Sequence, residues 1–112
     1  MSMGTHLVVN MYGCPRELLE RADVVLDLLN KIVEKAELQK VGESVFQFEP
    51  YGATAVVLLE ESHISIHTWP EREGSAAVDL FTCSGPEKNK LAYDALIELF
   101  KPERHTKQEI KR

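Results

Sequence analysis

Cysteine is scarce in this sequence, and the two that occur, Cys14 and Cys83, lie far apart without the CxxC spacing of a thiolate metal site. A disulfide framework is not expected, so each cysteine is interpreted as a free thiol. Long apolar runs are also missing, because none approaches the roughly 20 residues that a membrane-spanning helix needs. The start, MSMGTHLVVNMYG, lacks the basic region and long apolar segment of a signal peptide, so we expect a cytoplasmic protein without a membrane partner.

Basic residues are fewer than acidic ones. Lysine and arginine number 13 and aspartate and glutamate 18, which gives a formal net charge of -5. Since nucleic-acid phosphates require a concentrated positive field, no nucleic-acid partner is expected. The basic tail, KPERHTKQEIKR, is short and also contains acidic residues, which favours a solvated C-terminus.

The rest of the composition is that of an ordinary globular protein. Hydrophobic residues make up 44% and charged residues 28% of the 112 residues. A chain of this length is enough for one compact domain and too short for two. We therefore predict a single domain over residues 1–112.

Apolar periodicity predicts an alternation of strands and helices. Residues 6–12 form a short apolar strand, and a three- and four-residue repeat after Pro15 predicts one amphipathic helix that ends before Gly42. Four more strands are predicted from alternating or β-branched runs, at 43–48, 53–60, 61–69 and 76–83, the last two joined as a hairpin. A second helix over 91–99 is ended by Pro102, and a weak final strand can follow it.

This order predicts an α+β fold, a two-layer sandwich in which an antiparallel sheet carries both helices on one face. The other face of the sheet would then have no helices to cover it, and 112 residues provide only a small core. A homodimer with active sites near its interface is therefore expected.

One stretch, residues 61–71, combines strand alternation with an unusual density of reactive groups: ESHISIHTWPE. Ile64 and Ile66 supply a buried face, and the residues between them are hydroxyls and imidazoles. His63 and His67 are four residues apart on a strand, or roughly 13 Å, which is too far to share one zinc ion. No metal is therefore expected. A nucleophilic hydrolase that uses Cys83 and His67 is favoured even less than a metal site, because no oxyanion loop or orienting third residue is evident.

The register of the hairpin decides which of these groups meet. If the strands pair symmetrically about Arg72 and Glu73, Ser62 lies opposite Cys83, within about 5 Å. His67 then faces the other side of the sheet. It can act on Ser62 only if a bulge or strained peptide distorts residues 61–63, or if the site crosses a sheet edge or a subunit boundary.

The stretch ESHISIHTWPE, together with GTHLVVNMYGC at 4–14 and AVDLFTC at 77–83, closely resembles the prokaryotic S-adenosylmethionine decarboxylase proenzymes. The resemblance covers nearly the whole chain in order and size. It implies that the chain cleaves itself between Glu61 and Ser62. It also implies that Ser62 becomes a pyruvoyl group, a covalent cofactor at the new N-terminus.

The same resemblance implies roles for five further residues. His67 and Thr54 would assist maturation, and Cys83 would supply the proton that replaces the lost carboxylate. Phe48 would stack on adenine, and Glu71 would hold the ribose hydroxyls. Taken alone, Cys83 and Phe48 are more often buried core residues, and Glu71 more often a loop carboxylate.

Several positions depart from the family pattern. Asn10 and Thr5 stand where an acidic residue and an arginine are usual, VFQF at 45–48 replaces an FHRF-like segment, and Thr54 replaces serine. Thr54 keeps the hydroxyl, whereas the other changes remove charges that can position a substrate.

We therefore predict a self-processing, pyruvoyl-dependent decarboxylase with S-adenosylmethionine as substrate, whose product feeds spermidine synthesis. Arginine and ornithine remain alternative substrates, because altered pocket charges are what such a change would require. The alternative of another class is a non-catalytic α+β binding module.

Overall fold

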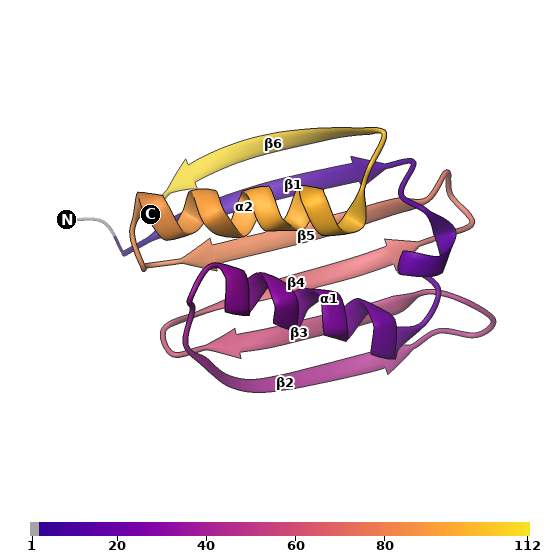
Figure 1. Cartoon of the computed structure of the whole chain (residues 1–112), viewed down its shortest axis with the longest axis horizontal. Helices are drawn as coiled ribbons and strands as arrows, with labels where there is room; N and C mark the ends of the chain where they lie inside the picture. The colour runs from indigo at the N-terminus through magenta and orange to yellow at the C-terminus, as the bar shows by residue number, and fades with distance from the viewer. Residues whose placement is uncertain (1–2) are drawn as a thin grey trace.

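The computed structural model describes residues 3–112, which form one sheet and two helices (Figure 1). The strands and helices of this part of the chain, in order, are β1 (Thr5–Tyr12), α1 (Ala22–Lys35), β2 (Lys40–Gln47), β3 (Ala53–Leu59), β4 (Ser62–Trp69), β5 (Ser75–Thr82), α2 (Pro86–Phe100) and β6 (Arg104–Lys111). The strands pair antiparallel in the spatial order β2-β3-β4-β5-β1-β6.

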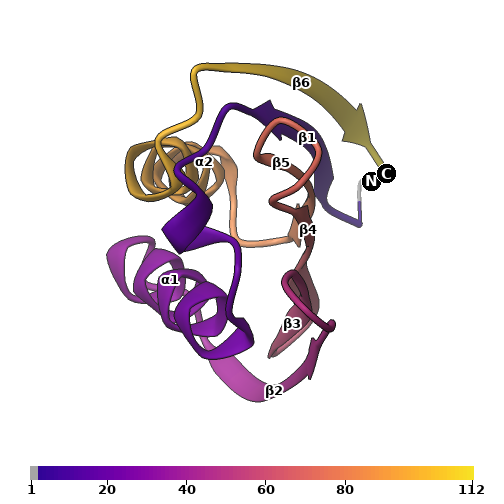
Figure 2. The same cartoon turned by 90° about the vertical axis from the view of Figure 1, so that its right-hand side faces the viewer.

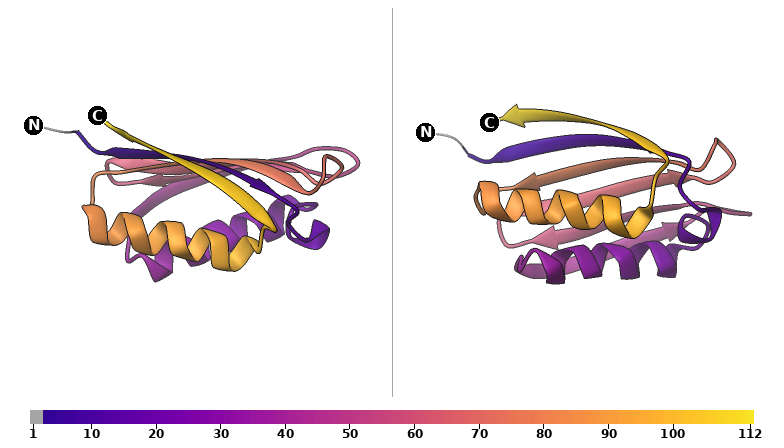
Figure 3. Two further views of the ribbon diagram at one scale, coloured as in Figure 1. Left: turned by 90° about the horizontal axis from the view of Figure 1, so that it is seen from above. Right: turned by 45° about the horizontal axis from the view of Figure 1, so that its top comes forward.

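Both helices pack on the same face of the sheet, as the views from the side show (Figures 2 and 3). We call this the helix face and the opposite one the open face. Alternate residues of β1, β4 and β5 are buried, because successive side chains of a strand point to opposite faces. The predicted two-layer α+β sandwich with both helices on one face is confirmed.

The core lies between the helices and the sheet. Its largest fully buried side chains come from both layers, for example Leu29 and Phe100 from the helices and Ile64, Ile66 and Leu80 from the strands. Burial of each such side chain contributes about 1.5–3 kcal/mol. In the part of the chain that the structure describes, no helix is long and apolar enough to cross a membrane.

The first helix is shorter than the periodicity predicts. After Pro15 the chain makes a 3-10 turn (η1, Arg16–Leu18), and α1 begins only at Ala22. The carbonyls of Leu19 and Glu20 cannot join a helix, because they accept hydrogen bonds from Thr68 and from Gly52. At the other end, β2 begins at Lys40, three residues earlier than predicted.

The predicted register of the β4–β5 hairpin is wrong by one residue. Trp69 pairs with Ser75, so the loop contains the odd number of five residues, 70–74, and is not centred between Arg72 and Glu73. Gly74 has a φ of 62° and lies against the backbone of Cys14, where a Cβ would not fit. With this register, Ser62 lies opposite Thr82.

The tail forms a strand and is not a loose segment. β6 pairs with β1 from Tyr12↔Arg104 to Thr5↔Lys111, which confirms the expected final strand. All eight of its residues are nevertheless exposed. The periodic signal is weak because an edge strand of this kind buries neither face.

No helix covers the open face in residues 3–112, and several large apolar side chains are exposed on it. Phe46 on β2 is 61% exposed and Leu58 on β3 is 49% exposed. Their pairing partners are Thr54 and Gly42. An apolar strand face that remains in water is typical of a surface that another layer covers.

Thr68 joins three segments of the core. Its buried hydroxyl donates to the Leu19 carbonyl at 2.8 Å and accepts from the Ala53 amide at 2.9 Å. Thr68→Val leaves both groups unpaired and should lower the free energy of unfolding by about 1–3 kcal/mol. Urea unfolding measures this loss, with the exposed Thr106→Val as control. Equal midpoints for the two variants would contradict the assigned role.

Candidate active site

The predicted site residues form two groups at opposite ends of β4. Glu61, Ser62 and Cys83 lie where β4 begins, and we call this the cleavage end. Thr54 and His67 lie toward the other end, with Phe48 and Glu71 in the loops beyond it. We call this second group the aromatic end.

At the cleavage end, β3 and β4 are joined by a tight turn. Leu59 pairs with Ser62, so only Glu60 and Glu61 form the connection. Ser62 is the first residue of β4 and, by the alternation of that strand, its side chain belongs to the helix face with Ile64. The peptide bond between Glu61 and Ser62 thus lies at the edge between an exposed turn and the ordered sheet.

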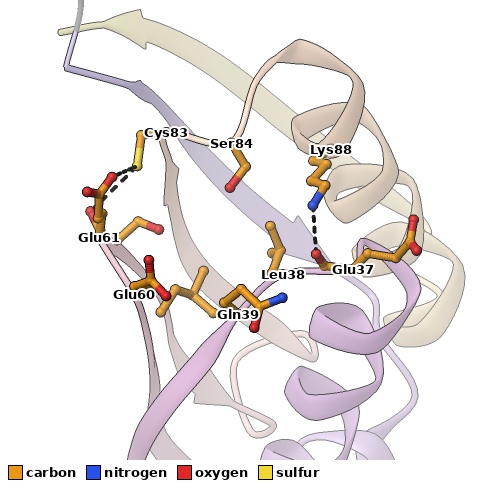
Figure 4. A pocket seen from close by; sticks show the side chains of 10 residues that line it. Glu37, Leu38, Gln39, Glu60, Glu61, Cys83, Ser84 and Lys88 are labelled. Carbon is orange, nitrogen blue, oxygen red and sulfur yellow. Dashed lines mark hydrogen bonds between the residues drawn. The ribbon is translucent and has the colours of Figure 1, made fainter.

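Cys83 follows β5 directly and lies beside Glu61. Its Sγ is 3.3 Å from Glu61 Oε2 and 3.9 Å from the Glu61 carbonyl oxygen (Figure 4). This hydrogen bond, partial desolvation and the charge of Glu61 raise the pKa of the Cys83 thiol. The thiol is therefore protonated at neutral pH, next to the carbonyl of the predicted cleavage site.

The two cysteines differ in environment. Cys83 is exposed, so its interpretation as a buried core residue is wrong. Cys14 is buried, and desolvation raises its pKa to about 11. Only Cys83 combines solvent access with a neighbouring polar partner.

A small pocket of about 130 Å³ adjoins the cleavage end, between the C-terminal end of α1 and the start of α2. Figure 4 shows its lining, which includes Glu60, Glu61, Cys83 and Ser84. Lys88 Nζ closes one side by donating to the Glu37 carbonyl at 2.8 Å. The volume is below the ~300 Å³ from which pockets for small molecules usually start.

The aromatic end contains a hydroxyl and an imidazole in direct contact. Thr54 and His67 are cross-strand partners, and Thr54 Oγ1 lies 2.8 Å from His67 Nδ1. The His67 ring is 6.1 Å from the Trp69 ring, measured between centroids. The hydrogen bond orients the imidazole ring.

A larger pocket of about 400 Å³ lies at the C-terminal end of β4, where the 48–52 and 70–74 loops converge. Phe48 and Glu71 both line it. Phe48 is 44% exposed, so its interpretation as a core residue is wrong. Sequence reasoning missed the other six lining residues, because the two loops meet only in the folded chain. They are Glu49, Pro50, Tyr51, Thr68, Trp69 and Arg72.

His67 does not reach Ser62 within one chain. The two residues are five positions apart on a regular strand, or about 16 Å, and their side chains belong to opposite faces. The pairing of β4 with β3 and β5 shows no bulge near Ser62. The distortion of residues 61–63 that would have brought them together is therefore absent. A site that crosses a sheet edge or a subunit boundary stays a prediction.

Within residues 3–112, no group of three or more histidine, cysteine or acidic side chains is placed to hold a metal ion. His63 and His67 are both on the open face, but Ser65 lies between them. The chemistry available is therefore that of a serine at a turn, a protonated thiol and a hydrogen-bonded imidazole.

Comparison with known proteins identifies relatives over nearly the whole chain. The chain is 45% identical over 103 residues to the S-adenosylmethionine decarboxylase proenzyme of Archaeoglobus fulgidus, covering 92% of this chain and 91% of that protein. It is 44% identical over 107 residues to the proenzyme of the same name from Aquifex aeolicus, covering 96% and 78%.

Solved structures show the same fold. The crystal structure of the adenosylmethionine decarboxylase from Aquifex aeolicus matches 99% of this chain and 91% of its own, with 41% identity and a TM-score of 0.93. A Trypanosoma brucei AdoMetDC-delta26 monomer matches with a TM-score of 0.66 and 19% identity, over 90% of this chain and 43% of its own. The family model described as S-adenosylmethionine decarboxylase matches residues 5–112, and the chain belongs to that family.

Proposed function

We propose that this protein is a self-processing, pyruvoyl-dependent decarboxylase that acts on S-adenosylmethionine and so feeds spermidine synthesis. The observation that carries the proposal is the cleavage end, where Ser62 follows an exposed turn and the Glu61 carbonyl lies beside the Cys83 thiol. Relatives with 44–45% identity are named proenzymes of this activity, which supports the same reading.

Self-cleavage needs a serine at this position. Ser62 Oγ adds to the Glu61 carbonyl carbon, the peptide C–N bond breaks, and the freed nitrogen takes the proton, so the amide becomes an ester. Removal of the Ser62 α-proton then expels the Glu61 carboxylate. Hydrolysis releases ammonia and leaves a ketone. The exposed Glu60–Glu61 turn can reorganise during these steps without disturbing the core.

The residues at the cleavage end fit a pyruvoyl group formed from Ser62. Ser62 is at the start of β4, and the neighbouring Cys83 thiol is exposed and protonated, as a proton donor to a substrate carbon must be. A pyruvoyl group supplies an electron sink for the loss of carbon dioxide. At the aromatic end, Phe48 offers a ring for stacking and Glu71 an acceptor for hydroxyls.

We further propose that the active site is shared between two copies of the chain. The cleavage-end pocket of about 130 Å³ is too small for a nucleoside, whereas the aromatic-end pocket holds about 400 Å³. If two open faces stack about a two-fold axis perpendicular to the strands, the aromatic end of each copy faces the cleavage end of the other. The exposed apolar side chains of the open face support this contact, since stacking buries them.

Ser62→Ala removes the only oxygen that can accept the Glu61 acyl group. Purified wild-type protein should separate into fragments of 61 and 51 residues on denaturation, whereas the variant stays whole. Intact mass spectrometry distinguishes the two outcomes. Wild-type chain that stays at full length after long incubation would contradict self-processing.

Mixing two inactive variants tests the shared site. His67→Ala and Ser62→Ala should each remain whole alone, but unfolding and refolding them together should permit cleavage of the His67→Ala chain, because the Glu61–Ser62 peptide of that chain then faces an intact His67 on the partner. Light scattering should give about twice the 12.7 kDa of one chain. A monomeric mass, or no cleavage in the mixed dimer, would contradict the arrangement.

Release of carbon dioxide from three substrates tests the specificity. S-adenosylmethionine should be decarboxylated, and Glu71→Gln should weaken its binding by roughly tenfold, as expected for one lost charge-assisted hydrogen bond. Arginine and ornithine have no ribose and should give no release. Release of carbon dioxide from arginine or ornithine alone would contradict the proposed substrate but not the pyruvoyl-dependent mechanism. Release from none by fully processed protein would favour the binding module.

A further inference from the structure

The observed register gives Ser62 a polar neighbour on the helix face. Leu80 pairs with Ile64, so two residues further along Thr82 lies opposite Ser62. Thr82 pairs with Thr5 on its other side. Three hydroxyls thus lie in one row across β4, β5 and β1, on the face that the helices cover.

The buried hydroxyl of Thr82 is energetically unfavourable at this position. It is 0% exposed, and its Oγ1 has no hydrogen-bond partner among residues 3–112. The same holds for Oδ1 of Asn89 on α2, which is 8% exposed. Burying an unpaired hydroxyl disfavours folding, and valine has the same shape without this cost. Packing alone therefore does not account for the hydroxyl of Thr82.

Space beside these two residues is sufficient for a bridging group. Thr5, Thr82, Cys83 and Asn89 line a pocket of about 160 Å³ under the start of α2. Such a polar pocket can hold ordered water. Directly opposed side chains approach within about 5 Å, a separation that one water molecule can bridge between the hydroxyls of Thr82 and Ser62.

Two other reactive groups are placed differently from Thr82. His67 is exposed on the opposite face of the sheet from the side chain of Ser62. Cys83 lines the cleavage-end pocket together with Ser62, but its thiol lies against Glu61. Thr82 provides a donor and an acceptor on the helix face, directly opposite Ser62.

We infer that Thr82 is a positioning residue for self-cleavage, which rests on the processing reaction proposed above. As Ser62 turns toward the Glu61 carbonyl, the Thr82 oxygen accepts the hydrogen bond of Ser62 Oγ–H, directly or through one water molecule; the proenzyme at rest lacks this contact among residues 3–112. This holds Ser62 Oγ against the Glu61 carbonyl carbon. The O–C bond forms as the C–N bond breaks, and the proton of Ser62 ends on the amide nitrogen, so no co-reactant is needed.

The test follows cleavage of freshly refolded proenzyme by intact mass over time. Thr82→Val should slow the appearance of the two fragments about tenfold or more, the effect of one lost hydrogen bond on a barrier. Thr82→Ser keeps the hydroxyl and should restore most of the rate. Thr5→Val is the matched control, because Thr5 lies in the same row but two strands, or about 10 Å, from Ser62.

Two further measurements separate positioning from a structural role. In a Ser62→Ala background that cannot be cleaved, Thr82→Val should unfold at the same or a higher urea concentration, because it removes an unpaired buried hydroxyl. Hydroxylamine, which cleaves esters, should release less Glu61 hydroxamate from Thr82→Val than from wild type. A lower unfolding midpoint, or an ester that accumulates in Thr82→Val, would overturn the inference.

The outcomes also separate this inference from the processing reaction itself. If wild-type chain is never cut between Glu61 and Ser62, the proposed processing fails and the assignment of Thr82 fails with it. If wild type is cut and Thr82→Val is cut at the same rate, only the assignment of Thr82 is overturned.

Discussion

The register of β4 between β3 and β5 is the constraint on which the rest of the site depends. Two turns set it, a two-residue connection at Glu60–Glu61 and a five-residue loop ending at Gly74. Because side chains alternate with a period of two, a shift of one residue would exchange the two faces of the hairpin strands relative to each other. The five-residue loop places Cys83 opposite Glu61 and Thr82 opposite Ser62.

The sequence was sufficient to predict the layers and most strands, because alternation around Ile64 and Ile66 is a strong local signal. It was insufficient for the hairpin register, because loop length depends on Glu73 and Gly74 adopting left-handed backbone conformations, which no periodicity reveals. The start of α1 was mispredicted for a related reason. Its limit comes from hydrogen bonds to the distant Thr68 and Gly52, which are tertiary contacts.

The site residues were found from a motif rather than from geometry. Residues 61–71 bring both ends of β4 into one stretch of sequence, so that Ser62 and His67 look like partners. The structure separates them by faces and by about 16 Å. Sequence proximity is therefore misleading here, and it becomes meaningful only if β4 of one copy lies across β4 of another.

The order of the strands also determines what holds the molecule together after the proposed cut. β1, β2 and β3 precede the cut and β4, β5 and β6 follow it, yet the sheet reads β2-β3-β4-β5-β1-β6. The two pieces are therefore interleaved, with three ladders between them, β3 with β4, β5 with β1, and β1 with β6. The cut protein is a non-covalent assembly of two peptides that cannot slide apart without global unfolding. Its unfolding then becomes dependent on protein concentration, because separated peptides must find each other again to refold.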